Sequence, residues 1–279
     1  MHVVEVGDGE PLLFVHGWPE SWCEWESVMA CAAGDGYRAM AIDLPGIGLS
    51  EDPAADGSKA HIASRVHEVI CALQIRDPTL VGHDAGGMAV FSYVRTYDDV
   101  SRCVIFDTVI PGLDPWDDVL RNPYIWHFAF HSLPHLPELL VGGHQREYFD
   151  YFYDILAARP DAITEDRRAR HAIAYTDARS LRAGFDLYRT LNADALVNRR
   201  VSPEMRAALL YVRGTDDPGD VEDYRAGFQR VGIRDVATAV VPGAGHFAPE
   251  ESPRETWQVI HEFLARHRTV TAAPLPDHA

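Results

Sequence analysis

The sequence is poor in the features that would place it in a specialised class of protein. Its four cysteines are scattered through apolar stretches and lack the spacing of a disulfide framework or a zinc site. No apolar run approaches the roughly 20 residues of a membrane span, and no charged segment leads into a signal-like run at the start. We therefore expect a cytoplasmic protein with free, mostly buried thiols.

Positive charge is also scarce. Lys and Arg together number 25 against 42 Asp and Glu, which gives a formal net charge of -17, and Lys59 is the only lysine. A chain with this balance repels a phosphate backbone, because binding would bring like charges together. Nucleic acid is therefore excluded as an expected partner and a small molecule is favoured, while association into a homo-oligomer is left open.

Short apolar runs rich in β-forming residues alternate with helical patterns along most of the chain. The runs are Leu12–Val15, Tyr37–Ile42, Thr79–Val81, Cys103–Phe106, Leu209–Val212 and Val236–Val241. Such runs, separated by helices, indicate buried parallel strands. The sequence therefore predicts an α/β fold with a mostly parallel, doubly wound sheet.

One interval, residues 111–200, interrupts this alternation with aromatic helical segments and no convincing strand. Two sets of residues in it fall on helical faces: Tyr148, Phe149, Phe152, Ile155 and Leu156, and Leu181, Phe185, Tyr188 and Leu191. Helices with aromatic faces at the end of a sheet can close a pocket. We predict an inserted helical cap at 111–200, a core formed by 1–110 and 201–268, and a disordered tail at 269–279.

The segment Gly82–Gly87 has the pattern of a nucleophile elbow. It follows a predicted strand, precedes a predicted helix, and is rich in glycine, so that one side chain can stand at a sharp turn. Asp84 holds the nucleophile's position, where the helix N-terminus favours an ionised carboxylate. Aspartate is also a common helix cap, which is the alternative for Asp84 taken alone.

Two further segments support the catalytic interpretation. His16–Pro19 follows the first predicted strand and places the amide of Trp18 where, with the amide of Ala85, it can form an oxyanion hole. Gly243–Phe247 follows the last predicted strand, and its glycines leave His246 free to act as a general base. Nucleophile followed by histidine is the chain order of α/β-hydrolases.

A carboxylate nucleophile restricts the chemistry. Attack of Asp84 on an ester or amide would give an anhydride, whereas attack on a saturated carbon gives an ordinary ester. His246 can then activate water to hydrolyse that ester. The sequence therefore predicts alkylation of Asp84, with no requirement for a metal or an organic cofactor.

These three motifs together resemble the epoxide hydrolase and dehalogenase branch of the α/β-hydrolase superfamily. Haloalkane dehalogenases carry a tryptophan directly after the nucleophile and fluoroacetate dehalogenases carry arginines near it, whereas this chain has Ala85 and Met88. The resemblance is closer to small bacterial epoxide hydrolases in which a lid histidine and tyrosine hold the epoxide oxygen. It implies that role for His127 and Tyr188, which periodicity alone would place in the core.

Two residues can supply the acid that orients His246. Asp107 follows the strand before the cap, and Asp217 lies in a Gly-Thr-Asp-Asp-Pro turn after the next core strand. The resemblance favours Asp107 and leaves Asp217 as the alternative. The predicted activity is hydrolysis of a largely apolar epoxide to a diol; the alternatives are hydrolytic dehalogenation and a non-catalytic receptor that kept the fold.

Overall fold

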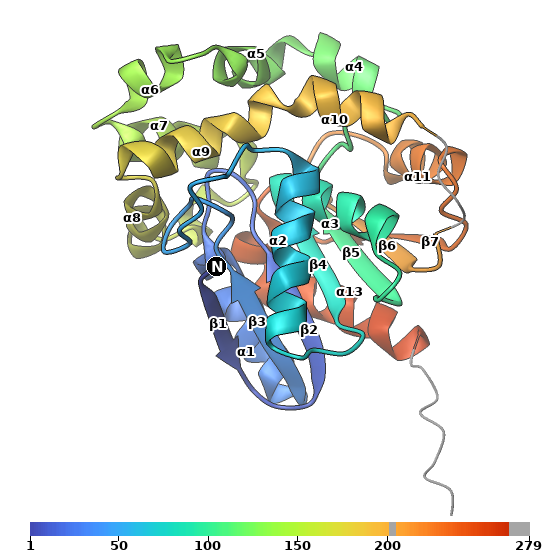
Figure 1. Ribbon diagram of the computed structural model, residues 1–279. Helices are drawn as coiled ribbons and strands as arrows, with labels where there is room; N and C mark the ends of the chain where they lie inside the picture. The colour runs from blue at the N-terminus through green and yellow to red at the C-terminus, as the bar shows by residue number, and fades with distance from the viewer. Residues whose placement is uncertain (201–204, 268–279) are drawn as a thin grey trace, which may run out of the picture.

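The computed structural model describes residues 1–200 and 205–267, so the predicted tail at 269–279 lies outside the described residues. Its centre is a seven-stranded sheet in the order β1-β3-β2-β4-β5-β6-β7. The strands are β1 (Val3–Val6), β2 (Glu10–Val15), β3 (Tyr37–Ile42), β4 (Thr79–His83), β5 (Arg102–Phe106), β6 (Ala208–Gly214) and β7 (Val236–Val241). Only β1 pairs antiparallel, on β3 at one edge (Figure 1).

All six predicted strands are present, and each begins and ends within two residues of its predicted bounds. The seventh strand, β1, was not predicted. It has four residues, of which Glu5 and Val6 are exposed, so it lacks the continuous apolar run that reveals a buried strand. The edge position explains this pattern, because only one side of β1 has a neighbouring strand.

Helices cover both faces of the sheet, as a doubly wound fold requires. Alternate strand residues point to opposite faces, so Leu13 and Val15 belong to one apolar cluster and Leu12 and Phe14 to the other. The helices of the core are η1 (Trp22–Trp25), α1 (Glu26–Gly34), α2 (Lys59–Ala72), α3 (Ala85–Thr96), α11 (Val221–Arg230), α12 (Ala248–Glu251) and α13 (Pro253–Arg266). Residues of α2, α3 and α11 fill the first cluster and residues of α1 and α13 fill the second.

Between β5 and β6 the described chain contains helices and loops and no strand, as predicted. These elements are α4 (Trp116–Arg121), η2 (Pro123–Ile125), α5 (Trp126–Ser132), α6 (Leu136–Val141), α7 (Gln145–Leu156), η3 (Pro160–Ala162), α8 (Glu165–Ala174), α9 (Ala178–Arg189) and α10 (Leu191–Asn198). Figure 1 shows α4, α5, α6, α9 and α10 arching over one end of the sheet. We refer to these helices from α4 to α10 as the cap helices.

The two predicted cap faces differ in how well they match the structure. Leu181, Phe185 and Tyr188 of α9 are all buried, as the predicted face required. On α7, Phe149 and Phe152 are buried, but Ile155 is 51% exposed and Tyr153 is buried in its place. The prediction for Ile155 was wrong because the buried face of α7 is centred closer to Tyr153.

Among residues 1–200 and 205–267, every helix is too short or too polar to traverse a lipid bilayer.

Candidate active site

The turn at Asp84 is a sharp strand-to-helix junction between β4 and α3. Asp84 has φ 46° and ψ -118°, a conformation that side-chain-bearing residues rarely adopt. The main chain packs so closely around this turn that only glycine fits at the neighbouring positions. A Cβ on Gly86 would lie 2.2 Å from the carbonyl oxygen of Val15. On Gly82 it would lie 2.5 Å from the carbonyl oxygen of Gly86. The chain therefore stores strain to present this one side chain.

The side chain of Asp84 makes no N-capping hydrogen bond, so the alternative role as a helix cap has no support in the structure. Instead its Oδ1 accepts the amide of Trp18 at 3.0 Å. Gly17 allows this approach, since a Cβ there would lie 2.7 Å from the Cβ of Asp84. The two predicted oxyanion donors, Trp18 and Ala85, thus both act on one carboxyl group.

Burial raises the pKa of Asp84, while the charge of His83 and the amides of Trp18 and Ala85 oppose that rise. The net direction is upward, which differs from the expectation based on the helix N-terminus alone. Desolvation is the stronger influence because the carboxylate lies beneath the cap helices. Such a carboxylate is poorly solvated, a state that favours nucleophilic attack.

His246 lies in the turn after β7 and lines the same cavity as Asp84. Burial lowers the pKa of His246 well below its usual value, and the charges of His83 and Arg213 add to this effect. The neutral imidazole is the form that a general base requires. Its main chain is held on both sides: the amide donates to Leu156 at 3.0 Å and the carbonyl accepts from His83 Nε2 at 2.9 Å.

His127 of α5 and Tyr188 of α9 line the cavity from the cap side. Their rings meet edge to face with centroids 5.8 Å apart, and both rings contact the indole of Trp18. Burial lowers the pKa of His127 to about 4 and raises the pKa of Tyr188 well above its usual value. Both groups are therefore neutral near pH 7, and the buried Nδ1 of His127 has no partner among the described residues.

Asp107 and Asp217 both line the cavity, and burial raises the pKa of each carboxyl group. For Asp107, burial and the charge of Asp217 raise the pKa well above its usual value. One oxygen of Asp107 accepts the amide of Gly214 at 2.9 Å, while Oδ2 is buried and without a partner among the described residues. Asp217 forms an ion pair with Arg213. Within the described residues, the ring of His246 makes no hydrogen bond to either carboxyl group.

The cavity that joins these groups has a volume of about 400 Å³. That size suits a small organic molecule. It is lined by the predicted site residues Trp18, Asp84, Asp107, His127, Tyr188, Asp217 and His246, together with apolar side chains such as Phe128, Phe152 and Leu156. Residues that lie far apart in the sequence therefore meet in one place.

A buried charge cluster below Asp84 was missed by the sequence reasoning. His83 Nδ1 lies 3.0 Å from a carboxylate oxygen of Glu20 and 3.0 Å from one of Glu24, and all three side chains are fully buried. Both ring nitrogens face acceptors, so both carry a proton and the ring is a cation. Burial alone would lower the pKa of His83, but the two glutamates outweigh it and raise the pKa well above its usual value. The available signal was the presence of Glu20 and Glu24 soon after the segment His16–Pro19.

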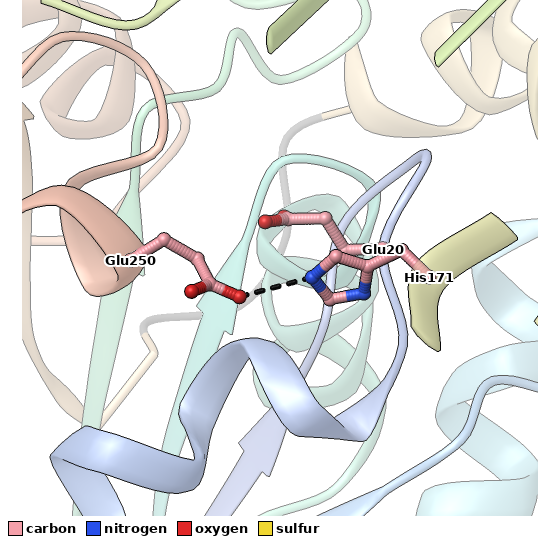
Figure 2. A group of neighbouring side chains, drawn as sticks. All are labelled: Glu20, His171 and Glu250. Carbon is pink, nitrogen blue, oxygen red and sulfur yellow. Dashed lines mark hydrogen bonds and ion pairs between the residues drawn. The ribbon is translucent and has the colours of Figure 1, made fainter. Parts of the chain in front are cut away.

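A second buried group, Glu20, His171 and Glu250, has the composition of a metal site (Figure 2). His171 Nδ1 accepts the amide of Ser21 at 3.2 Å, so the ring proton is on Nε2, which donates to Glu250 at 2.9 Å. A metal ion on Nε2 would force that proton onto Nδ1, opposite another donor. The tautomer therefore does not fit a metal ligand, and the group is a hydrogen-bonded cluster.

Comparison with known proteins agrees with this architecture. A family model described as the alpha/beta hydrolase fold matches residues 10–253. The chain is 30% identical to a soluble epoxide hydrolase of Corynebacterium sp. (strain C12), covering 95% of this chain and 93% of the relative. It is 36% identical to epoxide hydrolase 3 of Siraitia grosvenorii, covering 95% and 94%. The solved structure of the epoxide hydrolase CorEH superposes with a TM-score of 0.87 at 28% identity, covering 96% of this chain and 95% of that one.

The match extends over the sheet, the cap helices and the turns that carry the site residues. The matched range, residues 10–253, contains Trp18, Asp84 and His246. The chain therefore belongs to the α/β-hydrolase fold family, in the branch that contains epoxide hydrolases.

Proposed function

We propose that this protein is an epoxide hydrolase that forms an ester intermediate on Asp84. The observation that carries the proposal is the placement of two neutral donors, His127 and Tyr188, in the same cavity as a carboxylate at a strained turn. An opening epoxide releases an alkoxide, which needs an acidic hydrogen-bond donor, whereas a departing halide does not. Helices of the cap supply those donors, and we propose that residues 111–200 act as the cap.

In the first step a carboxylate oxygen of Asp84 bonds to one epoxide carbon and the carbon–oxygen bond of the ring breaks. The new alkoxide is hydrogen-bonded by His127 and takes a proton from Tyr188. Both donors keep their protons near pH 7, since the pKa of Tyr188 is raised and neutral His127 retains one N–H. Exclusion of water by Trp18, Phe128 and Phe152 strengthens these hydrogen bonds.

In the second step His246 takes a proton from water, and the hydroxide adds to the ester carbonyl of Asp84. The amides of Trp18 and Ala85 stabilise the oxyanion. Collapse of the tetrahedral intermediate breaks the bond between the carbonyl carbon and the diol oxygen, and that oxygen takes the proton from His246. Asp84 is left as a carboxylic acid, and its proton is transferred to Tyr188, which restores the phenol. The sum is one epoxide plus one water giving one diol.

We assign the acid of the triad to Asp107, in preference to Asp217. Asp217 is already paired with Arg213, whereas Asp107 has one buried oxygen free. A free buried carboxylate oxygen next to a general base can accept the second ring N–H of that base and stabilise the imidazolium that forms. The side chains of His246 and Asp107 would then approach to hydrogen-bond distance during the reaction.

The charges around the cavity indicate the substrate class. Six aspartates line it, Asp84, Asp107, Asp118, Asp217, Asp220 and Asp223, and among the described lining residues the only Arg or Lys is Arg213. Because Arg213 is paired with Asp217, no free guanidinium remains there to bind a carboxylate. We therefore propose a neutral, largely apolar epoxide, and we disfavour a haloacid. A cytoplasmic location and the oligomeric state stay predictions.

A panel of neutral epoxides, assayed for diol, tests the proposal against halide release from haloalkanes and haloacids. We expect diol formation and no halide. Halide release without diol would make the protein a dehalogenase. Turnover of neither class, with no adduct on Asp84, would favour the non-catalytic receptor.

A further inference from the structure

The turn that carries His246 is built directly against the end of α7 in the cap. The amide of His246 donates to the carbonyl of Leu156 at 3.0 Å. A Cβ on Gly245 would lie 2.4 Å from that carbonyl oxygen and 2.5 Å from the amide nitrogen of Ala158. The general base therefore sits in a turn whose shape depends on both the core and the cap helices.

Glu251 of α12 lies at the centre of this junction and is 3% exposed. Its Oε1 accepts the amides of Gly245 at 3.0 Å and Phe247 at 3.1 Å, which are the two residues that flank His246. Its Oε2 accepts the amide of Arg159 at 2.9 Å, just beyond α7. The guanidinium of Arg159 in turn contacts the carbonyl of Glu251 and the hydroxyl of Ser252.

These contacts make the buried carboxylate the shared acceptor of three amides, two from buried hydrogen bonds in the turn and one from a half-buried hydrogen bond at the cap. Hydrogen bonds from amides to a buried carboxylate are charge-assisted and stronger than those to a neutral acceptor. An amide left without an acceptor in such a place is costly, so the turn would shift if the carboxylate were lost. A shift of about 1 Å in a general base is enough to slow the step that uses it.

We propose that Glu251 is a positioning residue for His246, and that it ties the geometry of the general base to the cap. Hydrolysis of the Asp84 ester then depends on Glu251, whereas formation of the ester does not, because His246 acts only in the second step. This inference rests on the proposed function. It concerns the second of the two steps alone.

The neighbouring Glu250 offers a matched control. It is also a buried carboxylate on α12, but its hydrogen bond goes to His171 and not to the His246 turn. In Glu250→Gln the amide oxygen can still accept from His171 Nε2. In Glu251→Gln the new NH2 group must face at least one of the three main-chain donors, so at least one of them loses its acceptor.

Rapid-quench kinetics with excess enzyme and a neutral epoxide separate the two steps. For Glu251→Gln we expect hydrolysis of the ester to slow by about tenfold or more while its formation changes by less than about threefold, so that the Asp84 adduct accumulates in intact mass spectra. Glu250→Gln should change neither step by more than about twofold. An equal loss in both steps of Glu251→Gln, or no loss in either, would overturn the proposal.

Amide hydrogen exchange provides a readout that needs no substrate. We expect the amides of Gly245 and Phe247 to exchange about tenfold faster in Glu251→Gln than in Glu250→Gln, because they lose their acceptor. Unchanged exchange would overturn the positioning role even if the protein turned out not to be an epoxide hydrolase. Should Glu251→Gln fail to fold, Glu251→Asp keeps the charge and shortens the reach; it must then slow hydrolysis selectively, by about threefold or more, for the proposal to stand.

Discussion

The core side and the cap side of the cavity hold their functional groups in different ways. On the core side, Asp84 and His246 are fixed by main-chain hydrogen bonds and by glycines that admit no side chain. On the cap side, His127 and Tyr188 are fixed by ring packing around Trp18. Backbone geometry therefore defines the positions of the carboxylate and the base, whereas the packing of the cap helices on Trp18 defines the positions of the two donors.

The first prediction concerns removal of the general base on the core side. In His246→Gln the ester should still form within a few-fold of the wild-type rate, but its hydrolysis should slow by about 10³-fold, because the general base is gone. Intact mass spectrometry should then show an Asp84 adduct with the mass of the epoxide. Loss of ester formation to the same extent would mean that His246 acts in the first step as well.

The second prediction concerns removal of one hydrogen-bond donor on the cap side. Tyr188→Phe removes one donor to the developing alkoxide and should slow ester formation by about 10²-fold. Tyr148→Phe is the matched control, because the Tyr148 hydroxyl contacts His131 at 2.7 Å and does not line the cavity. Single-turnover rates of ester formation check both variants. Equal rates for Tyr188→Phe and wild type would remove Tyr188 from the ring-opening step.

The third prediction distinguishes between Asp107 and Asp217 as the acid that orients His246. Asp107→Asn should slow ester hydrolysis by about tenfold to a hundredfold, since it removes the carboxyl group that we propose stabilises the imidazolium of His246 during the reaction. Asp217→Asn should have a smaller effect, because its partner is Arg213. Rates of ester hydrolysis in the two variants decide the assignment, and the reverse order of effects would identify Asp217 as the triad acid.

The sequence predicted the core side better than the cap side for a physical reason. Gly82, Gly86 and Gly245 occupy positions where main-chain atoms crowd together, so local glycine patterns reveal those turns without knowledge of the fold. His127 and Tyr188 lie on helix faces that periodicity assigns to the core, and only resemblance to a family singled them out. The same limit explains the error at Ile155, since a helix pattern alone does not fix which residues are buried.

Charged groups that act through long-range contacts were the hardest to predict. The glutamates beside His83 and the junction at Glu251 depend on segments that are far apart in the sequence. Nothing in the local pattern around Glu251 indicates that Arg159 lies next to it. The sequence also could not reveal that Arg213 neutralises Asp217, which bears directly on the choice of acid.

A fourth prediction concerns the acidic lining of the cavity and has the smallest expected effect. Of two epoxides that differ only in a carboxylate or a carboxamide, the carboxylate should have a kcat/KM about tenfold lower at low salt, because the lining is acidic. Raising the ionic strength should narrow the gap. A carboxylate substrate that is equally good at low salt would contradict the assignment of a neutral substrate class.

The most direct test of the covalent mechanism is a single turnover in water enriched in oxygen-18, with enzyme in excess over epoxide. Hydrolysis at the ester carbonyl places the solvent oxygen in the side chain of Asp84 and leaves the diol unlabelled. We expect the peptide that contains Asp84 to gain one heavy oxygen. A labelled diol with an unlabelled Asp84 peptide would show that water attacks the epoxide directly and would contradict the mechanism.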